Sequence, residues 1–495
     1  MSHLFKNNLK IYFKIFKYSL FFFILLIFYN GFISYEGNLI LYTSFSIISN
    51  FLLFFGLRKN SIFFETFICI LLWLGFWFKF SCTIGISDGV FREGVGTFNY
   101  SKDSFDKALF VTQIGMLSFI FSSYFREKFL FKYPKKINLE FVKLYFVKKN
   151  SFKILSVFLI VILGINLLNF YFKIYQKGLI PIYDINFLIS GIFKWLLLFG
   201  LCAFLSIYVF YESRAFKRFF IFSSFVIFLE TFITSLAMLS RGMIFNAFAI
   251  LYGIYKYSKI VNIKNNINYY IKSTILILLL FYISVASVNY IRENFFYVGK
   301  SVKFTLENLK SSSEEYEDTT ETEIKKLNTI QAHNSQILFL IINRWVGIDG
   351  VMAVTSKKEI LNYKFFISSF EEKAKNNEPT FYEITFGLER NDGSNHPYEN
   401  VKGNTLPGII AFFYYPGSYY LLFIFIFIIS TFSSLIEYFA FKYSGKNMIF
   451  SSLIGMTIAY RLIHFGYLPH QSYLLFGAIF LTIIIAYFIN LIVTK

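Results

Sequence analysis

Long apolar runs, separated by short links that carry most of the positive charge, follow one another from end to end of this chain. Most runs are about 17 to 25 residues long, which is the length a helix needs to cross a hydrocarbon core about 30 Å thick. The pattern predicts membrane-crossing helices at 17–33, 38–57, 61–83, 108–125, 154–172, 194–211, 219–239, 243–258, 273–291, 405–439, 447–466 and 472–493. We therefore expect an all-α bundle of about twelve transmembrane helices, in which the longest run, 405–439, leaves room for a re-entrant or tilted start.

Composition agrees with this pattern. Hydrophobic residues make up 56% of the chain and charged residues only 16%, whereas about 25% of residues are charged in ordinary soluble domains. No small-residue cleavage site follows the first apolar run, so we expect the first helix to remain as an anchor. Cys69, Cys82 and Cys202 lie in or beside apolar runs, which favours packed thiols over disulfides or a metal site.

One long polar segment, residues 292–403, interrupts the apolar runs and holds 17 of the chain's 29 acids. It divides the chain into nine predicted helices at 1–291, a large loop at 292–403 and three predicted helices at 404–495. With 14 basic and 17 acidic residues the loop has a net charge of −3, and the remaining 34 basic and 12 acidic residues give +22. The net positive charge of the chain therefore lies outside the loop.

Lysine and arginine gather in alternate links. They crowd the N-terminal segment and the links at 58–59, 126–149, 214–218, 256–264 and 442–446, whereas the other links are poor in positive charge. Because positively charged links stay on the cytoplasmic side, we expect both termini inside and the large loop outside. The positive charge is then a property of the cytoplasmic face and gives no reason to expect nucleic acid as a partner.

Arginine is scarce in this lysine-rich chain, so its positions are informative. Six of the arginines fall on the predicted outer side: Arg92, Arg241, Arg292, Arg344, Arg390 and Arg461. A guanidinium offers a planar fork of donors that grips phosphate oxygens in pairs. Arg241 lies in the short turn 239–242 and is expected on one helix face with Glu230, about 16 Å deeper in the membrane, where an ionisable group is costly and marks function. Arg461 and His464, three residues apart, are expected to share another face.

Candidate acid–base groups gather late in the large loop. Residues 359–374 predict an amphipathic helix, and 379–402 predict a polar loop. That loop contains Tyr382, Glu383, Arg390, His396 and Glu399. Such crowded polar and aromatic groups suit carbohydrate, and His396, Glu399 and Glu383 are candidates for the base that takes a proton from a sugar hydroxyl. An ordinary surface loop is the alternative interpretation.

The sequence has no Asp-x-Asp triplet, no His/Cys cluster at metal spacing and no Gly-rich phosphate loop. These absences argue against a nucleotide-sugar glycosyltransferase that uses a divalent metal, and against an ATP-driven protein. We expect no metal and no cofactor.

Several short motifs occur in an order that resembles a known family. They are Gly178-Leu179-Ile180-Pro181-Ile182-Tyr183, Ser240-Arg241-Gly242, Asn343-Arg344-Trp345, Asn404-Thr405-Leu406-Pro407-Gly408-Ile409 and Tyr415-Pro416-Gly417-Ser418. With the predicted topology, this layout resembles the Wzy-type oligosaccharide repeat-unit polymerases of O-antigen and capsule systems and, more distantly, the O-antigen ligases. The likeness covers about residues 170 to 470, and the N-terminal third shows no motif of the family.

The resemblance implies a metal-independent enzyme of the bacterial inner membrane with a GT-C-like helical fold. Such an enzyme polymerises glycan repeat units carried on undecaprenyl diphosphate at the periplasmic face, beside membrane lipids, a flippase and a chain-length regulator. The candidate contacts of the diphosphate are Arg241, Arg344, Arg461 and Arg292. The candidate contacts of the glycan are Trp345, Tyr382, Arg390 and His464.

Other functions remain open at this stage. A ligase that moves finished glycan to another acceptor has the same general layout. A transporter or flippase of lipid-linked glycan is less favoured, because transporters commonly contain repeated groups of helices and none is evident here. A structural or sensory membrane protein would be favoured only if the large loop were dispensable.

Overall fold

The structure is a computed structural model, and it describes residues 2–86, 89, 91, 94–137, 144–177, 186–263, 267–295, 342, 345–373, 380–388 and 406–494. Within these ranges the chain is helical and contains no strand. The α-helices are α1 (Ser2–Ser34), α2 (Leu39–Gly56), α3 (Phe63–Leu72), α4 (Lys79–Ile86), α5 (Lys102–Phe125), α6 (Tyr145–Phe172), α7 (Phe187–Trp195), α8 (Leu201–Phe216), α9 (Ile221–Ala237), α10 (Phe245–Val261), α11 (Ile267–Phe295), α14 (Ile348–Ser356), α15 (Tyr363–Ser368), α16 (Phe381–Phe386), α17 (Gly408–Phe413), α18 (Tyr419–Tyr443), α19 (Met448–Ile463) and α20 (Ser472–Thr494). Three π-helical segments, η1 (Trp73–Phe78), η2 (Arg126–Leu130) and η3 (Leu196–Gly200), join α3 to α4, extend α5 and join α7 to α8, and the 3-10 turns are η4 (Arg241–Ile244), η5 (Lys358–Ile360), η6 (Ser369–Glu371) and η7 (Pro469–Gln471).

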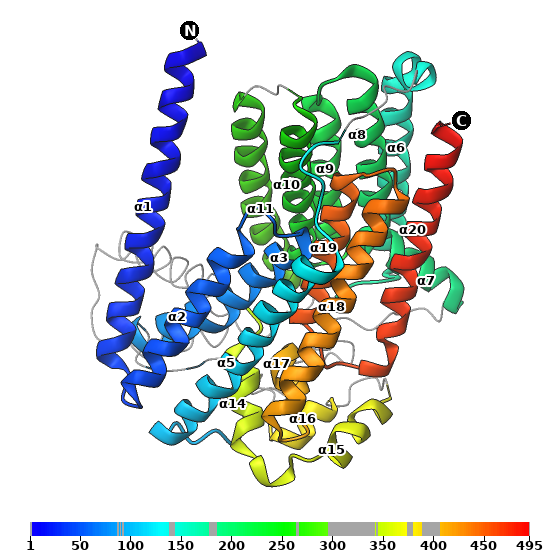
Figure 1. Cartoon of the computed structure of the whole chain (residues 1–495). Helices are drawn as coiled ribbons and strands as arrows, with labels where there is room; N and C mark the ends of the chain where they lie inside the picture. Colours follow the sequence, from blue (N-terminus) through cyan, green and yellow to red (C-terminus); the bar gives the residue numbers. More distant parts are fainter. Residues whose placement is uncertain are drawn as a thin grey trace, which may run out of the picture.

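Most of these helices form a bundle of membrane-crossing length. In the described residues eight helical stretches are long and apolar enough to span a bilayer: Leu39–Gly56, Phe63–Ile86, Lys102–Leu130, Val147–Phe172, Phe187–Phe216, Ile267–Arg292, Tyr419–Tyr443 and Pro469–Val493. Shorter apolar helices occupy Tyr18–Ser34, Ile221–Ala237 and Met448–Ile463. The expected all-α, multi-pass membrane bundle is confirmed at this level. Both ends of the chain lie at one end of the bundle, and α14, α15 and α16 lie at the other (Figure 1).

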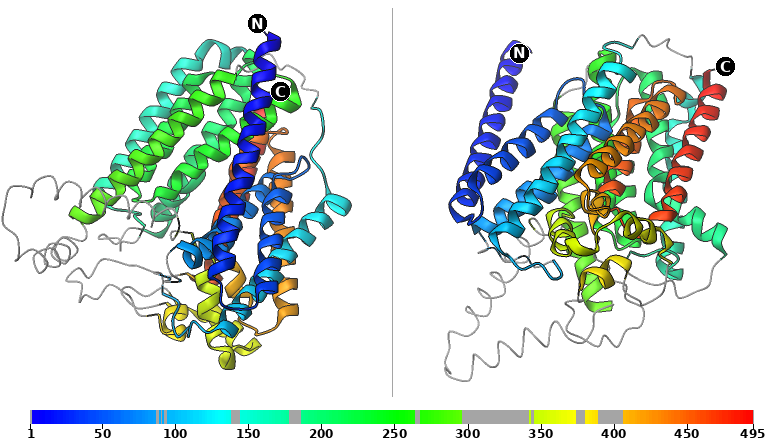
Figure 2. Two further views of the ribbon diagram at one scale, coloured as in Figure 1. Left: turned by 90° about the vertical axis from the view of Figure 1, so that its left-hand side faces the viewer. Right: turned by 60° about the horizontal axis from the view of Figure 1, so that its bottom comes forward.

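The stretch Phe63–Ile86, made of α3, η1 and α4, is the most enclosed crossing, whereas α6, α11 and α20 leave most of their surface exposed. Its π-helical middle meets the backbone of the large loop, because a Cβ added to Gly75 would overlap the carbonyl oxygen of Val346. Glycine is therefore required at this close approach. Figure 2 shows the central helices from two further directions, with the bundle around them.

A buried ion pair fixes the start of α14 beside this central stretch. The Lys79 ammonium contacts the carboxylate of Asp349, and both side chains are almost fully buried. The same ammonium donates to the carbonyl oxygen of Trp345 at 3.1 Å. Helix α14 packs against α5 and α17 and buries its apolar residues there, Ile348 and Val354 among them. The large loop is thus anchored inside the bundle at this point.

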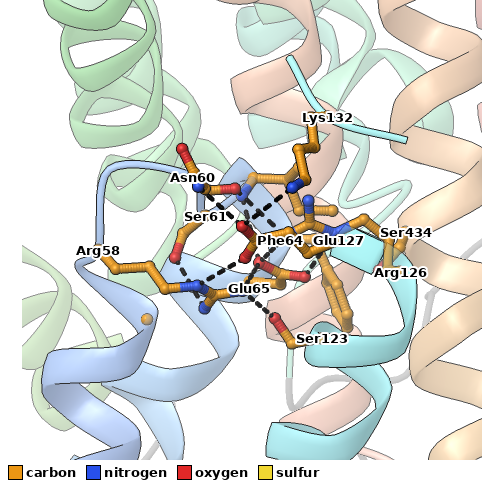
Figure 3. A network of polar contacts seen from close by, with 12 residues as sticks. Arg58, Asn60, Ser61, Phe64, Glu65, Ser123, Arg126, Glu127, Lys132 and Ser434 are labelled. Atoms are coloured by element: carbon orange, nitrogen blue, oxygen red, sulfur yellow. Dashed lines mark hydrogen bonds and ion pairs between the residues drawn. The ribbon is translucent and has the colours of Figure 1, made fainter. Parts of the chain in front are cut away.

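A second buried network lies where α2, α3 and α5 meet, at the end of α3 away from α14 (Figure 3). The Arg126 guanidinium donates from Nε and Nη2 to the two carboxylate oxygens of Glu65, at 2.8 and 2.6 Å. Arg58 reaches Glu65 at 3.4 Å and Glu127 at 3.2 Å. Glu437 of α18 accepts the backbone N–H groups that begin α3, which have no partner within their own helix.

Two expectations about helix boundaries need correction. Residues 359–374 do not form one amphipathic helix, since the backbone is extended at Leu361 and Asn362 and leaves only η5, α15 and η6. Residues 379–402 are not wholly a loop, because a capping box between Thr380 and Glu383 begins the short helix α16. The run 405–439, which left room for a re-entrant or tilted start, is divided into α17 and α18 by a turn in which Gly417 has a φ of 71°.

Candidate functional site

The chain turns sharply between α9 and α10, at the same end of the bundle as α14. Helix α9 ends at Ala237, Leu239 adopts a left-handed φ of 52°, and the turn η4 begins at Arg241. The expectation that Arg241 continues the helix of Glu230 is therefore wrong, because the left-handed residue breaks the helical path. Glu230 is buried within α9 and accepts a bond from Thr234 at 3.0 Å, so it is separate from this corner.

Carbonyl oxygens at the end of α9 accept hydrogen bonds from two other segments, the link after α6 and the end of α11. The oxygen of Met238 accepts the backbone N–H of Lys177 at 2.9 Å. Arg292, near the end of α11, donates from Nη2 to the oxygens of Leu239 at 2.7 Å and Lys177 at 3.1 Å. The last carbonyls of a helix lack partners within it, and cations are favoured there. The helix end therefore positions both Lys177 and Arg292.

Four cationic side chains share this corner: Lys177, Arg241, Arg292 and Arg461, hereafter the cation cluster. Each is half-buried. Arg241 donates to the Oδ1 atom of Asn289 on α11. The ammonium of Lys177 lies 5.2 Å from the ring centre of Tyr460, and Arg461 is the next residue in α19.

Electrostatics within the cation cluster is repulsive. Burial, together with the neighbouring charges of Arg292 and Arg461, lowers the pKa of Lys177 to about 8. In the part of the chain that the structure describes, no carboxylate forms an ion pair with Lys177 or Arg461. Gathering like charges in a half-buried place is unfavourable unless an anion offsets them. The arrangement therefore fits the binding of an anion with several oxygens.

His464 follows the last turn of α19 and lies against the cation cluster. Its Nδ1 is 2.9 Å from the carbonyl oxygen of Tyr460, and the centres of the two rings are 4.2 Å apart. Burial, with the charges of Lys177 and Arg461, lowers the pKa of His464 to about 4, against a hydrogen bond to Tyr460 that acts in the opposite direction. The imidazole is therefore neutral at physiological pH.

The depressed pKa of His464 makes stability depend on pH. As pH falls from 6.5 towards about 4, the unfolded chain takes up a proton on this histidine before the folded chain does, so folding stability decreases. We expect the apparent melting temperature of the detergent-solubilised protein to fall more across this window than that of the His464→Gln variant. The excess is expected to be on the order of 1 to 2 °C. Equal pH slopes for the two proteins would contradict the assignment.

Trp345 lies near the aromatic residues beside the cation cluster. Its ring centre is 6.1 Å from that of Phe245, which follows η4, and Phe245 is in turn 6.1 Å from Tyr460. The bond from Lys79 to the carbonyl oxygen of Trp345 holds this part of the large loop in place. An aromatic row thus runs from the large loop to the cation cluster.

The structure brings together several of the residues singled out by sequence: Arg241, Arg292, Arg461, His464 and Trp345. Tyr382 and Glu383 lie in α16, which Glu372 ties to the turn after α19 by accepting the N–H groups of Phe381 at 2.9 Å and Leu468 at 2.8 Å. Tyr382 is buried against Phe386.

The Glu383 carboxylate accepts the N–H of Thr380 at 2.7 Å within the capping box, which competes with a role as a base. The remaining candidates, Arg344, Arg390, His396 and Glu399, lie outside the described residues, as do Arg92 and most of the loop 292–403.

Lys177 and Tyr460 were missed by the reasoning from sequence. Lys177 directly precedes Gly178, the start of a motif that resembles the polymerase family, and it is a positive residue on a link expected to face outward. That combination is the same signal that singled out the arginines. Tyr460 had no such signal, since one aromatic residue among 36 tyrosines and 70 phenylalanines is not distinctive.

The described residues contain no group of three His, Cys, Asp or Glu side chains that could hold a metal ion. The chemistry present is instead that of guanidinium and ammonium donors, one neutral imidazole and aromatic rings. Such a site can bind an anion and stabilise negative charge that develops on it. In comparisons with known proteins, no family model, no curated protein and no solved structure matches this chain.

Proposed function

We propose that this protein is a membrane glycosyltransferase that polymerises oligosaccharide repeat units carried on undecaprenyl diphosphate. The observation that supports this function best is the cation cluster beside an aromatic row, at one end of a membrane bundle. A diphosphate carries several oxygens for the cations, the sugar attached to it has faces that pack on aromatic rings, and the lipid tail remains in the bilayer. One substrate therefore matches all three features.

Catalysis in this proposal depends on stabilising the leaving group. The hydroxyl of an acceptor sugar attacks the anomeric carbon of the donor, and negative charge builds on the departing lipid diphosphate. Donors already fixed in place, such as Arg241 on Asn289 and Arg292 on the end of α9, meet that charge without reorganising. Arg344 directly precedes the anchored Trp345 in the chain, and we assign it to the same diphosphate.

The proposal includes a topology of about twelve crossings with a GT-C-like arrangement, in the bacterial inner membrane, with both termini cytoplasmic. A flippase that delivers the substrate and a chain-length regulator are the partners that this activity would require. Both termini lie at one end of the bundle and α14 lies at the other (Figure 1), which is consistent with an even number of crossings.

Cysteine labelling tests the orientation. The native thiols Cys69, Cys82 and Cys202 are all buried, so the background should be low. We expect Tyr363→Cys, at an exposed position in α15, to react with an impermeant thiol reagent in cells with a permeabilised outer membrane. Lys59→Cys, exposed at the other end, should be protected. The reverse labelling would place the cation cluster in the cytoplasm and refute the proposed substrate.

An assay with purified components tests the activity. The protein in lipid vesicles is given single repeat units on undecaprenyl diphosphate, and the products are separated by size. A ladder of multiples of the repeat unit supports polymerisation. Transfer only to an added second acceptor would identify a ligase, and movement of the substrate across the vesicle membrane without new glycosidic bonds would identify a flippase. Either result would overturn the proposal.

A further inference from the structure

We propose that Nε2 of His464 accepts the proton of the attacking sugar hydroxyl, so that this histidine is the catalytic base of the polymerase. The inference rests on the proposed function, and it assigns a role that the charged members of the cation cluster cannot fill. A cluster of guanidinium and ammonium groups can hold the diphosphate, but none of its charged members has a lone pair to offer a hydroxyl proton.

The tautomer of His464 follows from its hydrogen bond. Nδ1 lies 2.9 Å from the carbonyl oxygen of Tyr460. A carbonyl oxygen can only accept, so Nδ1 must carry the hydrogen, and in a neutral imidazole Nε2 then carries the free lone pair. The bond also fixes the orientation of the ring, as does its tilted packing against the Tyr460 ring, with the two ring centres 4.2 Å apart. The imidazole is thus prepared to accept a proton at Nε2.

The surroundings of His464 keep it neutral. Lys177, from the link after α6, and Arg461, on the same helix, both oppose a positive charge on the ring. The carboxylate of Glu372 lies near the segment that follows His464, because its two oxygens accept the N–H groups of Phe381 and Leu468. Tyr175 lies near Arg461 and stays uncharged at neutral pH, because burial raises its pKa. The cation cluster therefore has two effects, since it attracts the diphosphate and disfavours imidazolium.

His464 is also close to the expected position of the leaving group. The Tyr460 ring, against which the imidazole packs, has its centre 5.2 Å from the Lys177 ammonium. The hydroxyl of Tyr460 approaches the corner so closely that a Cβ on Gly242 would be 2.5 Å from it. The base and the anion contacts are therefore arranged around one tyrosine ring.

The reaction balances with these groups alone. The acceptor oxygen forms a bond to the anomeric carbon, and the bond from that carbon to the diphosphate oxygen breaks with its electron pair leaving on the diphosphate. The hydroxyl proton moves to Nε2 of His464. The imidazolium formed beside Lys177 and Arg461 is destabilised, so it readily passes the proton to the departing diphosphate or to water, and the base is restored.

A direct test reads the tautomer without any activity. Protein labelled with nitrogen-15 at histidine is compared with its His464→Asn variant by NMR, which assigns the signals of His464 by their loss. We expect Nδ1 to carry the hydrogen and the ring to remain neutral down to about pH 5. A hydrogen on Nε2, or an imidazolium at neutral pH, would overturn the assignment even if the protein proves to be a polymerase.

A kinetic test uses the conservative variant His464→Asn, whose amide can still donate to the carbonyl oxygen of Tyr460. General-base catalysis typically contributes about 10² to 10⁴ in rate, so we expect turnover to fall by that factor while binding of the lipid-linked donor is retained. His470→Asn is the matched control, because His470 is exposed in the next turn. Equal turnover of His464→Asn and wild type would refute the base while leaving the polymerase intact.

Charge coupling provides a third measurement. Replacing Lys177 with Met removes one of the charges that oppose imidazolium, so the acidic limb of the pH–rate profile should move to higher pH. A role of His464 limited to capping α19 predicts no such movement. Failure of the wild-type protein to form any polymer would refute the proposed function, and the NMR result would still decide the tautomer.

Discussion

Replacing Arg241 with alanine is expected to slow the polymerisation of lipid-linked repeat units about 10²- to 10³-fold, with the amount of protein in the membrane unchanged. The loss of one preorganised charged donor in a water-excluded site typically costs about 2–4 kcal/mol of transition-state stabilisation. Arg241 is half-buried and directed by its contact with Asn289, so little reorganisation is needed when charge develops on the diphosphate. The measurement is the initial rate of ladder formation by the purified variant.

The Arg241→Lys variant separates charge from geometry. Lysine keeps the positive charge but lacks the planar fork that binds two oxygens together, so we expect a rate between those of wild type and Arg241→Ala. The same two substitutions at Arg344 should have similar effects, since both residues are assigned to the diphosphate.

Lys102→Ala is the control for a general loss of positive charge on this side of the bundle. Its side chain is 65% exposed and forms only a long contact of 3.8 Å with Glu36. If Arg241→Ala and Arg344→Ala both yielded full-length polysaccharide, the diphosphate would not lie on these two arginines. The contacts would then have to be sought around Arg461 and His464.

The membrane bundle was predictable because bilayer length imposes a strong pattern on sequence. Helices need about 20 apolar residues, and every backbone group in the bilayer must bond within its own element. The run 38–57, for example, matches α2 (Leu39–Gly56) closely, and Asn38 caps its start. Interruptions of helices were harder to foresee, as the π-helical segment η1 shows, because it lies against Val346, far along the chain, and a local pattern does not reveal such a contact.

The candidate site was predictable only in part. Rare arginines on the outer side indicated Arg241, Arg292 and Arg461 as functional candidates, and the structure places these three at one corner. It could not be known that Leu239 would break α9, since a left-handed leucine has no sequence signature. Nothing in the sequence was a reason to consider His464 as a base beside His396, Glu399 and Glu383, because its tautomer depends on a hydrogen bond that is visible only in a structure.

Removing the Glu65 carboxylate is expected to destabilise the protein by about 3–5 kcal/mol, because it leaves Arg126 buried without its anion. The Arg126 side chain is 0% exposed, and its other partners are the carbonyl oxygens of Phe131 and Asn60, at 3.1 and 3.2 Å. Neither can neutralise a full charge. We expect Glu65→Met to lower the melting temperature of the solubilised protein and its abundance in the membrane.

The reverse substitution should cost less. In Arg126→Met the Glu65 carboxylate keeps Arg58 at 3.4 Å and the N–H of Ile62 at 3.3 Å, so part of its charge remains compensated (Figure 3). In the double variant Glu65→Met, Arg126→Met both desolvated charges are gone, and apolar side chains of similar length replace them.

Such replacements of a whole buried pair are often neutral, so the double variant should be more stable than either single variant. The exposed pair Glu36 and Lys102, at 3.8 Å, provides the control, because surface pairs contribute about 0–1 kcal/mol. Additive losses in the double variant would show that Glu65 and Arg126 stabilise the bundle independently, and would remove the buried pair as the reason why α3 and α5 are held together at this end.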